Sequence, residues 1–155
     1  RPVRGMSESL IVYHSQSGAS AALALAAEQA IAKADLSARR LRAADAGSTE
    51  LDEAAGLLLV WAENSGRLAG GAKDFLDRIF YPAHERGLVL PYALLITAGN
   101  DGRSAVAEAR RIFSGIPFTE AMEPRIICGR PNAAGLREAG EYAAAFATGL
   151  SMGIF

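Results

Sequence analysis

The residues best placed to do chemistry lie in the loop Ser15–Ser20, which links a short apolar run to an Ala-rich segment. Hydroxyls at Ser15, Ser17 and Ser20, with the N–H groups that a helix start leaves unpaired, could surround one phosphate group. Gly18 lets the backbone turn tightly between them. The loop lacks the Gly-Lys-Ser/Thr of a Walker loop and the Gly-x-Gly-x-x-Gly of a dinucleotide loop. In isolation the pattern is more typical of a turn that caps a helix, but its position after a predicted strand favours phosphate binding.

For the other titratable side chains and the thiol, the sequence context mostly favours structural roles. His14 precedes the loop, where its ring could donate to a phosphate or be satisfied by backbone, and both alternatives stay open. We expect His84 to lie in a surface loop within 82–87, and Cys128 to be a packed thiol at a strand end. No cluster of His, Cys, Asp and Glu has metal-ligand spacing, so the sequence predicts neither a metal site nor a catalytic side chain. Four charged residues have the i,i+4 spacing of ion pairs on a solvated helix face: Lys73, Asp74, Asp77 and Arg78.

Short apolar runs bounded by turn residues predict strands that are buried on both faces. A weaker pattern at Leu36–Arg42 predicts a more exposed edge strand. The buried runs are Leu10–Tyr13, Leu57–Trp61, Tyr92–Thr97 and Arg125–Cys128.

Segments with helical periodicity lie between the predicted strands. Thr49, followed three residues later by Asp52, is a weak capping pattern for a short helix over Thr49–Ala54. The alternation of strands and helices predicts a parallel sheet with helices on both faces and right-handed crossovers. The longer predicted helices are Ala19–Lys33, Gly70–Phe80, Arg103–Phe113 and Ala133–Leu150.

In sheets of this kind, ligands bind outside the carboxyl ends of the strands. That rule selects four loops, three of which are rich in glycine, as expected where backbone turns tightly or approaches a ligand. The loops are His14–Ser20, Ala62–Gly70, Ala98–Arg103 and Gly129–Asn132.

The composition sets limits on partners and compartment. A chain of 155 residues that is 50% hydrophobic can bury one sizeable core, so we expect one domain over residues 6–155. Met6 could be the natural start, in which case residues 1–5 would be a remnant ahead of it, and the sequence leaves this open. A net charge of −1 and a pI near 6.2 offer no basic field to nucleic acid or an anionic membrane, which leaves small molecules and proteins as partners. A single cysteine and no apolar run long enough to span a bilayer predict a cytoplasmic location.

Two motifs and one further loop carry a resemblance to the flavodoxin-like superfamily, which covers the chain from Ser9 to Leu150. The loop 15–20 is similar to the family's phosphate loop, Ser/Thr-x-Thr/Ser-Gly-x-Thr, with serine in the last place. The segment 63–78 resembles Pro-Glu-Asn-Phe-Gly-x-Met-x-Gly-x-x-Lys-Asp-Phe-Phe-Asp-Arg, a segment of flavodoxin-like NAD(P)H-dependent reductases. Residues 97–102 are similar to the loop after the fourth strand of those proteins.

The resemblance implies a flavodoxin-like three-layer α/β sandwich around a five-stranded parallel sheet of order 2-1-3-4-5. It also implies FMN as the cofactor, with its phosphate on the first loop and its isoalloxazine ring flanked by the loops after the third and fourth strands. The cofactor-binding residues that it implies are Ser15, Gln16, Ser17, Gly18, Ala19, Ser20, Trp61, Ala62, Glu63, Asn64, Ser65, Gly66, Thr97, Ala98, Gly99, Asn100 and Asp101.

The chain departs from the family pattern beside the expected ring site. Trp61-Ala62 stands where relatives often have Thr-Pro, and Ser65 stands where they place an aromatic residue. Losing a ring that stacks on the flavin would cost on the order of 1 kcal/mol. Trp61 is either a replacement ring or a side chain that fills the flavin site.

The resemblance favours an NAD(P)H-dependent flavin or quinone reductase, with Arg67 at the rim placed to meet a nicotinamide phosphate. A flavodoxin-type electron carrier is the first alternative, against which the small net charge argues, because carriers present an acidic face. A binding or scaffold protein with a degenerate flavin site is the second alternative.

The apolar tail 149–155 should pack on its own domain or on another subunit, and we expect a homo-oligomer such as a dimer.

Overall fold

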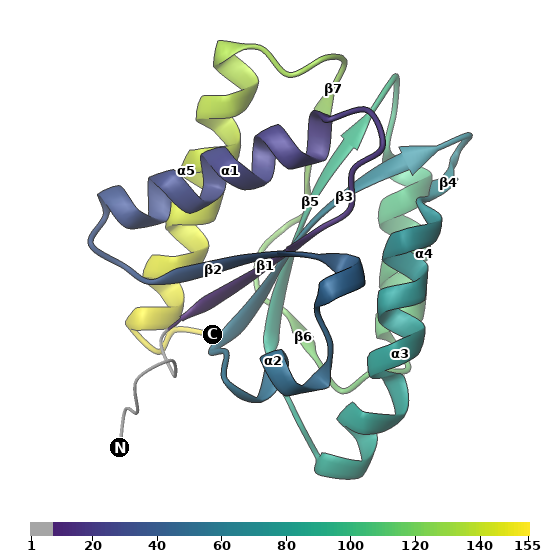
Figure 1. The fold of residues 1–155 in the computed structure, drawn as a ribbon, viewed down its shortest axis with the longest axis vertical. Coiled ribbons are helices and arrows are strands. Elements are labelled where there is room, and N and C mark those ends of the chain that lie inside the picture. Colours follow the sequence, from purple (N-terminus) through teal and green to yellow (C-terminus); the bar gives the residue numbers. More distant parts are fainter. Residues whose placement is uncertain (1–7) are drawn as a thin grey trace.

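A parallel β-sheet lies at the centre of the computed structural model, which describes residues 8–155 (Figure 1). The strand order is β2-β1-β3-β5, and two short strands then share the free edge of β5. β6 pairs with the beginning of β5 and β7 pairs with its end, so together they act as one interrupted fifth strand. The predicted order 2-1-3-4-5 is confirmed. The strands are β1 (Ser9–Tyr13), β2 (Ala38–Arg42), β3 (Gly56–Asn64), β5 (Pro91–Ala98), β6 (Thr119–Glu120) and β7 (Arg125–Cys128).

Helices cover both faces of the sheet, which confirms the predicted three layers (Figure 1). α1 (Ala19–Lys33) and α5 (Ala133–Ser151) bury apolar side chains such as Leu23 and Phe146 on one face. The other face is covered by the 3-10 turn η1 (Ala43–Asp45), α2 (Ser48–Asp52), α3 (Gly70–Arg86) and α4 (Arg103–Phe113).

The apolar runs form strands because their side chains are buried on both faces; Leu57, Leu58, Leu59 and Val60 are all fully buried. The register sets Tyr13 beside Val60 and Ala62 beside Thr97, so that three strands end close together. The loops that follow these strands therefore meet at one edge of the sheet, as the ligand rule requires.

Two local expectations about helices are wrong. α3 runs through Pro82 to Arg86 instead of ending at Phe80, so His84 lies in its last turn with its ring against Phe80. Burial of Ala83 in the core outweighs the local proline signal. α2 begins one residue earlier than expected, and the carboxylate of Glu50 accepts a hydrogen bond from the N–H of Gly47 at 2.7 Å, in place of a cap by the Thr49 side chain.

The start of α3 holds the start of the first loop in place. The backbone N–H of His14 donates to the carbonyl of Val60 at 3.2 Å, and its imidazole lies against Gly71. A Cβ at Gly71 would lie 2.2 Å from Nδ1 of His14, closer than atoms can approach. His14 therefore packs on α3, and the close contact requires glycine at position 71.

A β-hairpin extends β3 beyond its predicted end and is tied to α4. β4 (Arg67–Leu68) pairs antiparallel with the end of β3 across a turn at Ser65 and Gly66, whose φ values are 51° and 75°. The Glu108 carboxylate accepts from the N–H of Leu68 at 2.9 Å and from the Arg67 guanidinium at 3.3 Å. The bonds from Arg67 and then Leu68 hold the pKa of Glu108, whose exposed fraction is 5%, below its ordinary value. Arg67 is thus engaged with α4 and is not the free rim cation that the sequence predicted.

The apolar tail packs partly on its own domain. The Phe155 ring stacks on Phe146 with centroids 5.8 Å apart and lies over Gly149, while Met152 and Ile154 are 67% and 64% exposed. The predicted association of chains stays a prediction.

In residues 8–155, no helix combines the length and hydropathy that a membrane crossing needs. Met6 and the segment 1–5 lie outside the described residues.

Replacing Gly71 with Ala should destabilise the fold by about 1–3 kcal/mol, because the new methyl group overlaps the His14 ring. Gly70→Ala is the matched control, since nothing lies within 4 Å of a Cβ there. Urea unfolding would measure both, and adding His14→Ala to Gly71→Ala should recover part of the loss. Equal stability of the two alanine variants would contradict the packing described for His14.

Replacing Glu108 with Gln should cost about 1–2 kcal/mol at pH 7, because the hairpin loses charge-assisted hydrogen bonds. The folded-state pKa of Glu108 is depressed, so its contribution is complete above the ordinary value of 4.5 and is lost as the pH falls below it. The difference in unfolding free energy between the native protein and the variant should therefore shrink below about pH 4. Glu85→Gln, at an exposed residue of α3 with no ion pair in residues 8–155, is the control. A difference that stays constant down to pH 3 would rule out this titration.

Candidate functional site

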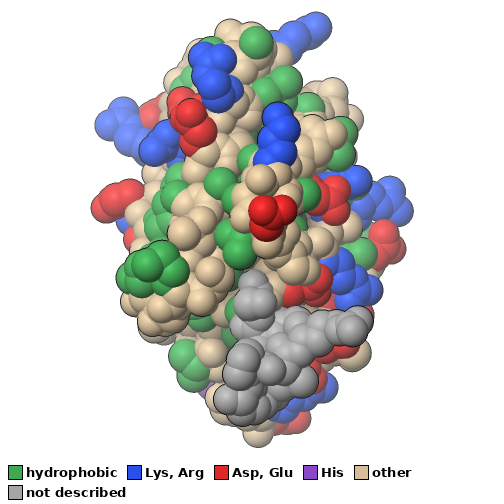
Figure 2. Space-filling model, turned by 90° about the vertical axis from the view of Figure 1, so that its left-hand side faces the viewer, with side chains coloured by type: hydrophobic (Ala, Val, Ile, Leu, Met, Phe, Trp, Pro, Cys, Tyr) green, Lys and Arg blue, Asp and Glu red, His purple; other side chains and the backbone are tan. Residues whose placement is uncertain are grey.

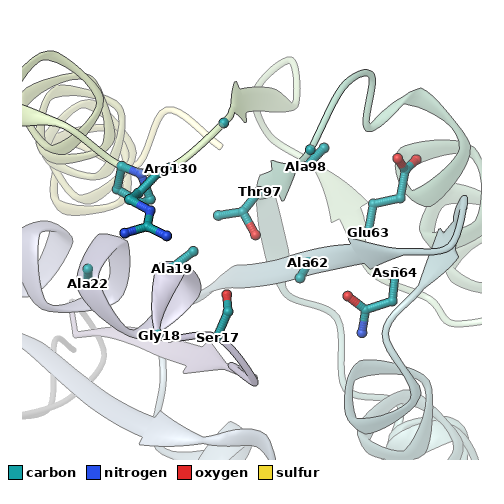
Figure 3. A pocket seen from close by; sticks show the side chains of 13 residues that line it. Ser17, Gly18, Ala19, Ala22, Ala62, Glu63, Asn64, Thr97, Ala98 and Arg130 are labelled. Atoms are coloured by element: carbon teal, nitrogen blue, oxygen red, sulfur yellow. The ribbon is translucent and has the colours of Figure 1, made fainter.

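A pocket of about 580 Å³ opens at the carboxyl edge of the sheet (Figure 3). Its sides are the start of α1, the ends of β3 and β5, and the loop between β7 and α5. The predicted site residues that line it are Ser17, Gly18, Ala19, Ala62, Glu63, Asn64, Thr97, Ala98 and Gly99.

The first turn of α1 presents free backbone donors to this pocket. Gly18 adopts a left-handed conformation with φ of 96°, and its own N–H donates to Oγ of Ser15 at 3.0 Å. The next three N–H groups, of Ala19, Ser20 and Ala21, have no acceptor within residues 8–155. The turn carries no acidic side chain, so the positive end of the helix dipole is uncompensated. This arrangement is suited to an anion.

The three serines of the loop have different roles. Ser17 is exposed, and Figure 3 shows its hydroxyl directed into the pocket. Ser15 shapes the turn through its bond with Gly18. Ser20 is buried, and its Oγ lies 3.2 Å from Oγ1 of Thr97, which fastens α1 to β5. The structure thus brings only one of the three predicted phosphate hydroxyls into the pocket.

The loop after β3 braces the site. The Glu63 carboxylate accepts from the N–H of Gly102 at 3.2 Å and from that of Ala105 at 3.4 Å, so its charge caps α4. The side-chain amide of Asn64 donates to Oε1 of Gln16 at 2.7 Å and joins this loop to the first one. In Figure 3 the two side chains point in different directions from the end of β3.

The walls of the pocket are formed by small side chains, with Ala62, Thr97, Ala98 and Gly99 at the strand ends. No aromatic side chain from residues 8–155 lines it. Trp61 is fully buried on the opposite face of the sheet, edge-on to Phe75 with ring centroids 6.1 Å apart. It therefore neither replaces the missing ring nor fills the pocket.

Four predicted residues at the tips of the second and third loops do not line the pocket. Ser65 and Gly66 form the hairpin turn. The carbonyl of Asn100 accepts from Sγ of Cys128 at 3.1 Å, which makes Cys128 an exposed thiol tied to a loop rather than a packed one. Asp101 is paired with Arg103 at 2.6 Å, and that guanidinium holds the pKa of Asp101 below its ordinary value.

The sequence-based selection missed the loop between β7 and α5, from which Gly129, Arg130 and Pro131 line the pocket. The strand order predicts this loop at the ligand edge, but the family motifs do not include its residues. A signal was present: Arg130 is a basic residue in a ligand-edge loop with no acidic residue within four positions, whereas Arg67 and Arg103 have Glu63 and Asp101 nearby.

No protein-family model and no curated protein sequence matches the chain. Solved structures do. A flavodoxin from the domain Archaea superposes with a TM-score of 0.81 at 19% identity, over 93% of this chain and 99% of the other. A WrbA-like flavodoxin from Agrobacterium tumefaciens gives 0.79 at 14% identity, over 94% and 98%. A flavodiiron core from Synechocystis gives 0.79 at 17% identity, over 94% of this chain but 36% of that one.

These likenesses extend over nearly the whole chain, and the first two also extend over nearly the whole of the other protein. At identities this low, they establish the fold and leave the ligand and the activity to be argued from the pocket. The chain has the flavodoxin-like fold.

Proposed function

We propose that the protein binds FMN in this pocket and is an NAD(P)H-dependent flavin or quinone reductase. The observation that carries the proposal is the free amide cradle at the start of α1, which opens directly into a cleft with small-residue walls. The flavodoxins among the structural neighbours share this fold over 93–94% of this chain and 98–99% of their own.

The residues present fit the phosphate end of FMN. The amides of Ala19, Ser20 and Ala21 offer three donors, and the Ser17 hydroxyl offers a fourth. The carboxylate that lines the pocket, on Glu63, is directed to the α4 amides rather than to the start of α1. Riboflavin, which lacks the phosphate, would forgo these bonds.

The residues present also fit a flat ring. The pocket's volume of about 580 Å³ lies inside the range of about 300–1,000 Å³ that small-molecule sites occupy. Ala62, Ala98 and Gly99 would border the ring, because they line the pocket away from the phosphate cradle. Since no aromatic side chain from the described part of the chain covers the pocket, one face of the ring would stay open to a nicotinamide.

A bound flavin supplies hydride and electron transfer through its own ring. The chain's own residues would bind the flavin, orient its ring and leave one face accessible to a second substrate. Glu63 and Asp101 are both held by other groups, so neither is free to serve as a proton donor or acceptor in the pocket. The proposed reaction needs no protein acid or base.

An electron carrier is the second candidate, because flavodoxins are among the neighbours that match 90% or more of this chain. The charges argue against it. Asp101 and Glu108 are paired with Arg103 and Arg67. On the side of the molecule that Figure 2 presents, which is the left-hand side of Figure 1, charges of both signs are mixed. An acidic docking face for a redox partner is therefore not formed by these residues.

The test begins with apoprotein and FMN. Trp61 is the only tryptophan and lies next to Ala62 of the pocket wall, so its fluorescence should be quenched as FMN binds. The double variant Ser17→Ala with Gly18→Val should bind at least about tenfold more weakly, because it removes a donor and strains the turn at φ of 96°. Gly153→Val, at another left-handed glycine outside the pocket, is the control for strain alone.

Anaerobic stopped-flow mixing of the FMN-loaded protein with NADH or NADPH then decides the activity. A reductase loses the flavin absorbance on mixing with one of the nucleotides and transfers the electrons to a quinone or free flavin. Flavin that stays oxidised with both nucleotides, yet is reduced by a reductase protein, would establish the carrier. Failure to retain FMN would leave the scaffold alternative.

A further inference from the structure

We infer that Arg130 is the specificity-determining residue that makes the pocket prefer a phosphorylated ligand over its unphosphorylated counterpart. This inference rests on the proposed function and extends it to a fourth loop. Figure 3 shows the Arg130 side chain descending from the loop after β7 toward the start of α1, where Ala19 and Ala22 line the same pocket.

Arg130 is the one uncompensated cation of the pocket within residues 8–155. Arg67 and Arg103, which lie on neighbouring loops, are paired with Glu108 and Asp101. Across the described chain, the cations without a carboxylate within 4.0 Å are Lys33, Arg111, Arg130 and Arg137, of which only Arg130 lines this pocket.

The loop that carries Arg130 is fixed at both ends. The N–H of Gly129 donates to the carbonyl of Ala98 at 2.8 Å, which ties the loop to β5. On the other side, Pro131 restricts its own φ, and Oδ1 of Asn132 accepts from the N–H of Gly135 at 2.8 Å to cap α5. Because the backbone on both sides is held, Arg130 has little backbone freedom to lose on binding an anion.

The charges around the cradle favour a dianion. The amides at the start of α1 contribute partial positive charge, and Arg130 adds a full one, while the Glu63 carboxylate accepts hydrogen bonds from the first amides of α4. Arg130 is exposed, so its attraction for a phosphate should weaken as salt screens it. A ligand without phosphate would gain almost nothing from this side chain.

The test compares Arg130→Gln with Arg137→Gln, an arginine on α5 that is also unpaired but lines the separate groove between α1 and α5. Arg130→Gln should weaken FMN binding by about tenfold at low salt and riboflavin binding by less than about twofold. Raising the ionic strength should reduce FMN affinity in the native protein more than in this variant. Arg137→Gln should change none of these values. Arg130 has no hydrogen bond or ion pair to the rest of the described chain, so its variant should fold normally.

Two results would overturn the inference: FMN affinity that is unchanged in Arg130→Gln, or FMN and riboflavin affinities that fall equally. If the native protein binds neither flavin, the proposed function fails and the inference is decided with inorganic phosphate. Phosphate should then raise the melting temperature of the native protein, relative to chloride at equal ionic strength, and should do so less in Arg130→Gln. Equal protection of both proteins, or of neither, would overturn it.

Discussion

The pocket depends on the way in which β1 passes the chain to α1. Gly18 turns the backbone with a positive φ, and its N–H donates a hydrogen bond to the Ser15 hydroxyl. The amides that follow have no acceptor within residues 8–155. The packing of His14 on Gly71 and the bond between Ser20 and Thr97 fix this turn from two sides. The proposed anion site is therefore preorganised, and little conformational entropy would be lost in ordering it when a ligand binds.

The acids around the pocket are held by partners that keep them from opposing an anion. Glu63 caps α4, Asp101 pairs with Arg103, and Glu108 holds the hairpin through Leu68 and Arg67. Each of these bonds serves the fold, and each also gives a carboxylate near the ligand edge a donor within the protein. Because no aromatic side chain of residues 8–155 lines the pocket, we expect most of the binding free energy to come from the phosphate end of the ligand.

Much of the fold could be predicted because its signals are local. The run Leu57–Trp61 is apolar throughout since both faces of β3 are covered, and α1 and α4 begin after Gly18 and Gly102 as their periodicity indicates. Other features depend on partners far along the chain. β4 exists because Glu108, forty residues away, binds the Leu68 amide, and α3 continues past Pro82 because Ala83 reaches the core.

The same distinction applies to the candidate site. The loop 15–20 is recognisable from its own residues, but strand alternation sends Trp61 into the core while Ala62 faces the pocket, and local sequence leaves that orientation open. Ser65 stands at a motif position, yet the hairpin places it in a turn outside the pocket. Arg130 enters the site only because β7 ends beside β5, which brings its loop next to the start of α1.

The central claim is that the free amides at the start of α1 hold the phosphate of a flavin mononucleotide. Backbone amide NMR of the isotopically labelled protein tests it most directly, with FMN and riboflavin titrated in parallel. We expect the amide protons of Ala19, Ser20 and Ala21 to shift downfield with FMN, because they acquire a charged acceptor, and to shift little with riboflavin. Unchanged chemical shifts of these three amides while FMN binds would contradict the phosphate assignment. So would a pattern in which the largest shift changes belong to residues of the groove between α1 and α5.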